Sequence, residues 1–201
     1  MDSESATEQD AGRTHCWSGR GIAFAPLEIT DAPLVHRWRS DPAAAHETGV
    51  WPGSLYELTE RIERHLDDSS RDDFLVLLPD GTPAGLIALH DQQMAEGTAE
   101  AYLILDREHR EHREHRGRGL GVAALDALTD LAFGELPMQR VEAFTHTDNA
   151  PALSVLAAAG FTPEGVRRSS CLHRGRRYDN AVLSLLRTEW EALERPRSWE
   201  L

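Results

Sequence analysis

The feature of this 201-residue chain that most constrains its fold is the glycine-rich stretch Arg116-Gly117-Arg118-Gly119-Leu120-Gly121. An apolar run, Ala101–Leu105, precedes it, and a run with helical spacing of apolar residues, 122–133, follows it. A strand, a glycine loop and a helix start form a site for a phosphorylated ligand, because loop N–H groups and the helix dipole attract phosphate. The sequence therefore predicts a phosphate-binding loop between a strand and a helix.

A repeat lies directly upstream of this loop, where the triplet Arg-Glu-His occurs three times between Arg107 and His115. We interpret the repeat as a tandem duplication carried as a surface bulge. Two alternatives give it a function. Its arginines would bind a phosphate of the ligand, or its histidines would bind a metal. The metal interpretation is the weakest, because steps of three drift around a helix and no carboxylate or cysteine completes a tetrahedral site.

The overall composition excludes several classes of protein. A formal net charge of −13 argues against a nucleic-acid binder, which needs a basic face, and is compatible with a cationic partner. All 21 basic residues are arginine, so a phosphate-loop lysine and catalysis through a lysine Schiff base are both excluded. Two cysteines, Cys16 and Cys171, make no disulfide framework, which favours a reducing cytoplasm. No apolar run of about 18 residues exists, so we expect no membrane segment.

Hydrophobic periodicity predicts the order β-α-α-β-β-β-α-β-α-β-β, which is a mixed α/β class. The expected strands span 21–27, 74–78, 83–90, 98–105, 140–145, 162–171 and 178–186. The expected helices lie within 31–41, 54–66, 122–133 and 150–159. Residues 1–17 are expected to be a disordered acidic tail, 18–193 a single domain and 194–201 a polar C-terminal tail.

Two interpretations of the glycine loop compete. A dinucleotide-binding fold places its glycine motif after the first strand, whereas this loop follows the fourth expected strand. The pattern Arg116-x-x-Gly119-x-Gly121 instead resembles the acyl-CoA pyrophosphate loop of the GNAT superfamily of N-acetyltransferases. The segment Asn149–Phe161 is similar to that family's short helix ending in Gly-Phe. Two further segments, 37–42 and 175–190, resemble the RimJ/RimL-type branch, so the resemblance covers roughly 21–190.

The resemblance implies a fold, a co-substrate and a set of residues that hold it. The fold is a mostly antiparallel sheet of six to seven strands, splayed between the fourth and fifth strands and flanked by about four helices. The co-substrate is acetyl-CoA, with no metal. Strand backbone holds the pantetheine arm, the loop holds the pyrophosphate, and the short helix lies near the thioester; a plain helix cap is the alternative role for its asparagine. The implied binding residues are Leu103, Ile104, Leu105, Arg116, Gly117, Arg118, Gly119, Leu120, Gly121, Asn149 and Ser154.

Candidate catalytic residues follow from the same resemblance. Glu100 begins the strand that would carry the thioester, and its carboxylate would act as a base through water; a solvated charge at the strand end is the alternative. Leu156 stands where many relatives have a tyrosine that protonates the departing thiolate. Ser154 is then the nearby hydroxyl, or a solvent-facing serine, and Tyr178 is another possible acid. Weaker candidates are His90, Glu142 and His146, the last expected in a surface loop.

The expected reaction is direct attack of an amine on the acetyl-CoA thioester. Deprotonating an α-amino group of pKa about 7.7–8.0 costs only about 1 kcal/mol at pH 7, against roughly 4–5 kcal/mol for an alkylammonium. The first hypothesis is therefore an acetyltransferase for a protein or peptide N-terminus. The alternatives are a small-molecule amine acetyltransferase (antibiotic, polyamine or amino sugar) and a non-catalytic acyl-CoA-binding module. The acidic residues of segment 36–68 would attract an amine, whereas the arginines of hairpin 166–178 would attract an acidic group. A homodimer is a further expectation from the resemblance.

Overall fold

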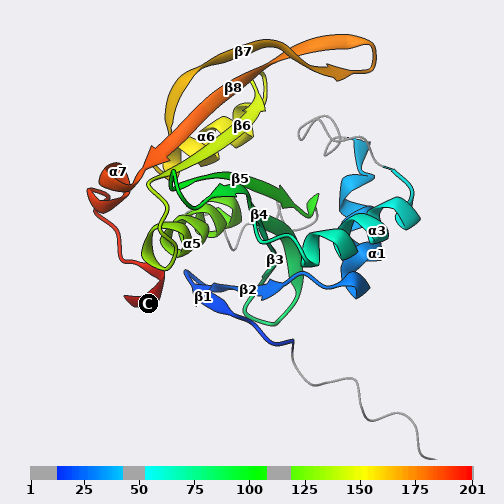
Figure 1. Ribbon diagram of the computed structural model, residues 1–201, viewed down its shortest axis with the longest axis horizontal. Coiled ribbons are helices and arrows are strands. Elements are labelled where there is room, and N and C mark those ends of the chain that lie inside the picture. The colour runs from blue at the N-terminus through cyan, green and yellow to red at the C-terminus, as the bar shows by residue number, and fades with distance from the viewer. Residues whose placement is uncertain (1–12, 43–52, 108–118, 201) are drawn as a thin grey trace, which may run out of the picture.

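The computed structural model of the chain describes residues 13–42, 53–107 and 119–200 (Figure 1). An eight-stranded sheet has the order β1-β2-β3-β4-β5-β6-β8-β7. Every neighbouring pair is antiparallel except β5 and β6, which run parallel. The strands are β1 (Trp17–Gly19), β2 (Ile22–Pro26), β3 (Asp72–Leu77), β4 (Pro83–Gln93), β5 (Thr98–Leu105), β6 (Arg140–His146), β7 (Thr162–His173) and β8 (Arg176–Leu186).

Helices cover both faces of the sheet, and each face has its own apolar core. One core lies beneath α5 and α6 and includes Leu128 and Leu156, whereas the other lies beneath α1 and α3 and includes Trp38 and Ile62. The described helices are α1 (Ala32–Arg39), α3 (Leu55–Leu66), α5 (Leu120–Gly134), α6 (Ala150–Ala158) and α7 (Arg187–Glu191), with short 3-10 turns η1 (Ile29–Asp31) and η3 (Ser198–Glu200).

Strand β5 supplies residues to both cores by simple alternation. Ala99 and Ala101 face the α5 side, whereas Ile104 belongs to the core beneath α1 and α3, and Tyr102 packs against that core. Successive side chains on a strand point to opposite faces. Glu100 therefore shares the α1 and α3 face with Tyr102.

Local sequence signals explain where several elements begin. The Ser54 hydroxyl accepts a hydrogen bond from the Glu57 N–H, and the Glu57 carboxylate accepts one from the Ser54 N–H. This capping box starts α3 at the predicted place. Between β3 and β4, the Leu78 N–H donates to the Thr82 carbonyl at 2.9 Å and closes the turn that joins the two strands.

The predicted mixed α/β fold is confirmed, including the mostly antiparallel sheet. The sequence missed one strand, because β1 has only three residues and lies at the edge of a polar segment. Trp17 was expected in the acidic tail, yet it begins this strand. Most of the Arg-Glu-His repeat lies outside the described residues, as do three predicted phosphate-binding residues, Arg116, Gly117 and Arg118.

The C-terminal segment differs from the expected polar tail. The Arg195 side chain is only 5 % exposed and forms ion pairs with Asp126 and Asp130 of α5. Ser198 is 2 % exposed, and its hydroxyl donates to Asp130 at 2.8 Å. Polar residues here pack on the domain because α5 offers buried carboxylates that need partners.

None of the described helices combines the length and the apolar character that crossing a membrane requires.

Candidate active site

Strands β5 and β6 part after a short paired stretch. Their parallel pairing covers only Thr98 with Arg140, Ala99 with Val141 and Glu100 with Glu142. Beyond Glu100, β5 continues to Leu105 paired only with β4. Backbone N–H and C=O groups of Ala101 and Leu103 on the β6-facing edge are therefore available to a ligand that carries amide groups. The predicted splay between the fourth and fifth expected strands is confirmed.

Glu100 lies where the two strands part. It is half-buried and makes no hydrogen bond or ion pair to residues in the described ranges. Burial raises the pKa of this carboxyl, and the negative charges of Asp91 and Glu142 add to the shift, while the positive charge of Arg167 opposes it. A desolvated carboxylate without a committed partner is suited to accept a proton near neutral pH.

The neighbouring carboxylate is committed to an ion pair. Arg140 donates to Glu142 at 2.7 and 2.9 Å and also binds Glu164. Glu164 further accepts the Ser184 hydroxyl at 2.8 Å. Arg140 therefore links Glu142 of β6 to Glu164 of β7, whereas Glu100 has no such cation among the described residues.

Two histidines beside the site are held by an arginine. Arg71 donates to Asp73, to His65 Nε2 at 3.1 Å and to His90 Nε2 at 2.8 Å. A guanidinium only donates, so the Nε2 of each ring is the acceptor, and the longer 3.4 Å approach of His90 to Asp73 is not a second hydrogen bond from that atom. Burial and Arg71 lower the pKa of His65 to about 4. The His90 ring stacks on Tyr102 with centroids 5.4 Å apart.

Strands β6, β7 and β8 provide the opposite side of the opening. The Arg167 guanidinium lies 4.1 Å from the centre of the Phe144 ring. His146 stacks on Tyr178 with centroids 5.2 Å apart and is 2 % exposed. The expectation that His146 lies in a surface loop is therefore wrong, because β6 extends one residue further and Tyr178 covers the ring.

The first turn of α5 lies beside the far end of β5. A Cβ at Gly121 would stand 3.0 Å from Val155 of α6 and 3.6 Å from Leu105 of β5. Gly119 is the N-cap and supplies no side-chain cap; its carbonyl accepts from the Val122 and Ala123 N–H groups, while the Leu120 and Gly121 N–H groups have no partner among the described residues. This helix start suits a phosphate group close to the open end of the splay.

The remaining predicted residues are placed as follows. The Asn149 side chain caps α6, accepting from the Ala152 N–H at 3.2 Å and donating to Thr145 at 3.1 Å. Ser154 is exposed on α6, while Leu156 is buried in the core. Tyr178 lies six residues along β8 from Ser184, the partner of Glu142, which is roughly 20 Å of strand.

Strand β5 thus carries Glu100 and the open backbone of Leu103 on the way to the α5 start, whereas Tyr178 is remote from Glu100. The sequence analysis missed Tyr102 and Phe144, which share the Glu100 face with Glu142. Strand alternation was the signal that locates them. Within the described ranges, no group of three or more His, Cys, Asp or Glu residues is arranged to hold a metal ion.

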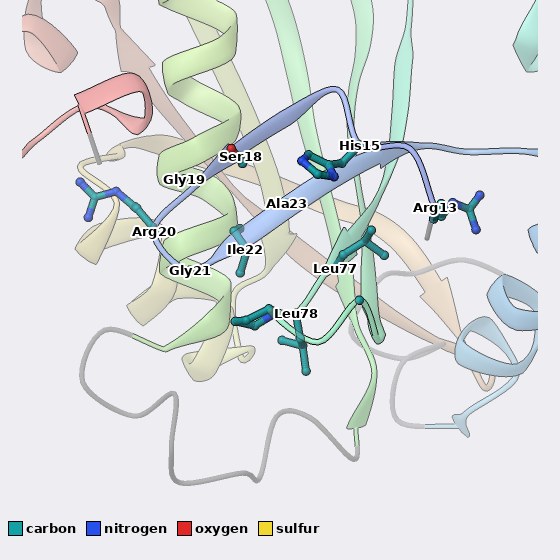
Figure 2. Close-up of a pocket in the computed structure, with 12 residues that line it drawn as sticks. Arg13, His15, Ser18, Gly19, Arg20, Gly21, Ile22, Ala23, Leu77 and Leu78 are labelled. Atoms are coloured by element: carbon teal, nitrogen blue, oxygen red, sulfur yellow. The ribbon is translucent and has the colours of Figure 1, made fainter. Parts of the chain in front are cut away.

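A separate hollow of about 590 Å³ lies on the β1–β2–β3 side of the sheet (Figure 2). Its two arginines are already paired, Arg13 with Asp31 and Arg20 with Asp126. Figure 2 shows these side chains at opposite ends of the hollow. We therefore place the candidate site at the β5–β6 opening, where an uncommitted carboxylate and open backbone groups coincide.

Comparisons with known proteins identify the family of the chain. Residues 22–162 match the family model described as an acetyltransferase (GNAT) domain. The chain is 28% identical over 185 residues to a probable N-acetyltransferase, YjcK, of Bacillus subtilis, covering 86% of this chain and 98% of that protein. It is 25% identical over 166 residues to the spermidine N(1)-acetyltransferase of Escherichia coli K12, covering 82% and 85%.

One further relative and one solved structure extend the comparison. A putative ribosomal N-acetyltransferase, YdaF, of Bacillus subtilis is 34% identical over 115 residues, 57% of this chain and 60% of that protein. The crystal structure of a Vibrio cholerae spermidine N-acetyltransferase with CoA and spermine superposes with a TM-score of 0.76 at 21% identity, covering 85% and 98%. With the splayed strands and the family match over most of its domain, the chain belongs to the GNAT family of acetyl-CoA-dependent N-acetyltransferases.

Proposed function

We propose that this protein transfers the acetyl group of acetyl-CoA to the primary amine of a small molecule. The observation that carries the proposal is Glu100, a half-buried carboxylate with no described partner at the point where β5 and β6 part. Similarity to spermidine acetyltransferases supports a small amine as acceptor. The two described cysteines are free, which is consistent with a cytoplasmic protein.

We assign the binding of acetyl-CoA to backbone groups rather than to side chains. The open edge of β5 at Leu103 would bind the amide groups of pantetheine, and the N–H groups of Gly119–Gly121 would bind pyrophosphate. When bound, acetyl-CoA supplies an activated acyl group. Asn149 keeps the start of α6 in place beside this channel through its cap and its bond to Thr145.

Glu100 is assigned the role of base. An ammonium acceptor must lose a proton before it can attack a thioester, and Glu100 would take that proton directly or through one water. Its raised pKa makes the transfer more favourable than an ordinary exposed glutamate would. Ser154 and Tyr178 remain proposals for returning a proton to the thiolate, although only a rearrangement would bring Tyr178 near Glu100.

A protein N-terminus is the second candidate acceptor. It is favoured by the identity with the putative ribosomal N-acetyltransferase YdaF, which covers just over half of this chain. Together with this candidate acceptor, we propose that the chain belongs to the RimJ/RimL-type branch and forms a homodimer.

Acetyl-CoA turnover, followed as release of free thiol, tests the proposed function. Spermidine, aminoglycosides, amino acids, aminoalkyl phosphates and short peptides form the acceptor panel. We expect turnover with at least one small amine, and the product is identified by mass spectrometry. Tight CoA binding without turnover on any amine would contradict an enzymatic role and support a non-catalytic acyl-CoA-binding module.

Substitution of Gly121 by valine is expected to weaken acetyl-CoA binding. Even a Cβ would stand 3.0 Å from Val155, so a branched side chain must push the first turn of α5 away from α6 and β5. We expect the KM for acetyl-CoA to rise about tenfold or more, with a smaller change in kcat, because helix N–H groups lose their alignment. Gly165→Val is the matched control, since a Cβ there meets nothing within 4 Å. An unchanged KM in Gly121→Val would remove the α5 start from the binding site.

A further inference from the structure

The acidic residues of α3 do not face the candidate site. The Glu57 carboxylate accepts from the Ser54 N–H in the helix cap, and Glu60 accepts from the hydroxyl of Tyr56, a residue that is 70% exposed. Leu58 and Ile62 form the buried face of the helix. The earlier expectation that acidic residues of this segment attract the amine is therefore not supported for the described residues of α3.

On α3, an arginine and not these acidic residues lies on the side that faces the sheet. Arg61 lies three residues after Leu58 and four before His65, so all three share one side of α3. His65 contacts Arg71 at 3.1 Å, which places this side of the helix toward β3 and β4. Arg61 is half-buried, and it is close enough to Tyr102 of β5 to interact electrostatically with it.

Arg61 has no counterion among the described residues. Burial lowers the pKa of Arg61, and the positive charges of Arg39, Arg64 and Arg71 lower it further. Arg71 is neutralised by Asp73, but Arg39 is half-buried and likewise has no ion-pair partner among the described residues. A partly desolvated pair of guanidinium groups without a carboxylate is costly, and an anionic ligand removes that cost.

The distance between this pair of arginines and Glu100 indicates which kind of ligand could contact both. Tyr102, beside Arg61, follows Glu100 by two residues on the same face of β5, a separation of about 7 Å. A small acceptor spans this distance when its amine is at Glu100 and an acidic group is a few bonds away. Arg167, held over Phe144, adds positive charge on the opposite side.

We propose that Arg61, with Arg39 beside it, binds a carboxylate or phosphate of the amine acceptor. This inference rests on the proposed N-acetyltransferase function and specifies its substrate class: a primary amine carrying an anionic group, such as an amino acid, an aminoalkyl phosphate or a peptide with an acidic residue near its N-terminus. Polyamines carry only positive charges, so the same arginines disfavour them.

Acceptor pairs that differ in one charge provide the first test. O-phosphoethanolamine is compared with ethanolamine, glycine with glycinamide, and a peptide with glutamate at its second position with the same peptide carrying glutamine. We expect kcat/KM to be about tenfold or more higher for the anionic member of the preferred pair. If the larger effect occurs in a small-molecule pair, the preferred acceptor is a small molecule; if it occurs in the peptide pair, the preferred acceptor is a peptide. Equal rates within every pair, or spermidine as the best acceptor, would overturn the proposal.

The variant Arg61→Gln provides the second test. We expect its KM for the anionic acceptor to rise about tenfold or more, with kcat and the KM for acetyl-CoA changed less than about twofold, and its preference within the pair to disappear. Arg64→Gln, on the exposed side of the same helix, is the control and should retain the preference. An unchanged preference in Arg61→Gln contradicts the assignment. Absence of turnover with all acceptors would instead contradict the proposed function.

Discussion

Replacing Glu100 by glutamine is expected to lower kcat about 100- to 10,000-fold while the KM for acetyl-CoA changes less than about twofold. Glutamine has nearly the same shape but cannot accept the proton of the attacking ammonium. Its amide also leaves the open backbone of β5 in place, so donor binding is preserved. Steady-state kinetics with saturating acetyl-CoA and a varied acceptor measure both parameters.

The pH profile separates a base from a merely structural residue. Burial raises the pKa of Glu100, so the acidic limb of kcat/KM should lie above the pKa of an ordinary glutamate in the wild type and should be lost in Glu100→Gln. As pH rises, more of the acceptor is already a free amine, so the deficit of the variant should shrink. Turnover equal to that of the wild type from about pH 6 to about pH 9 would remove Glu100 from the mechanism.

Two controls exclude unfolding as the cause of lost activity. A carboxyl whose folded-state pKa is raised destabilises the folded protein as pH rises through that pKa. Glu100→Gln should therefore have a Tm at neutral pH no lower than the wild type. Glu96→Gln, an exposed change in the turn between β4 and β5, should leave both kcat and Tm unchanged.

The central elements of the fold were predictable because local signals agreed with the tertiary arrangement. The helix expected within 54–66 begins after Ser54, which forms a capping box with Glu57, and alternation along 98–105 gives a strand with two different faces. The resemblance placed the opening between the correct strands. Glu100 was singled out because a carboxylate at a strand start near this opening is chemically distinctive, and its catalytic role stays a prediction.

Other features depend on contacts between distant segments and could not be predicted. The ring of His146 is buried by Tyr178, which lies 32 positions along the chain in another strand. Acidic residues of α3 were expected to attract the acceptor, but the orientation of Leu58 and Ile62 turns Arg61 rather than Glu60 toward the sheet. The number of charges in a segment does not show which side of a helix carries them.

The C-terminal segment is a third such feature. Its polar residues resemble a solvated tail in sequence, whereas the structure places them on two buried carboxylates of α5. Arg195 lies 2.8 Å from Asp130 and 3.3 Å from Asp126, and Arg20 lies 3.2 Å from Asp126. Asp130 also accepts hydrogen bonds from Trp190 at 2.8 Å and from the Ser198 N–H at 2.7 Å.

We expect Arg195→Met to lower the free energy of unfolding by about 3–5 kcal/mol, because it leaves Asp130, which is 0% exposed, without its cation. For a chain of this size the corresponding loss in Tm is roughly 6–20 °C. Thermal and urea unfolding at neutral pH measure both quantities. The exposed neighbouring change Glu194→Gln should have almost no effect. A loss below about 1 kcal/mol would show that this ion pair contributes little more than a surface pair does.

The pH dependence of the same variant provides an independent check of the cause. Burial alone would raise the pKa of Asp130, but hydrogen bonds from Arg195 and Trp190 outweigh it and hold that pKa below its usual range. The stabilisation from this carboxylate is therefore present above the unfolded-state pKa and is lost as pH falls through the folded-state pKa. In Arg195→Met the carboxyl protonates more readily, so the stability gap to the wild type should narrow in acid. A gap that stays constant from neutral to acidic pH would indicate that lost packing of the arginine stem, and not the unpaired charge, destabilises the variant.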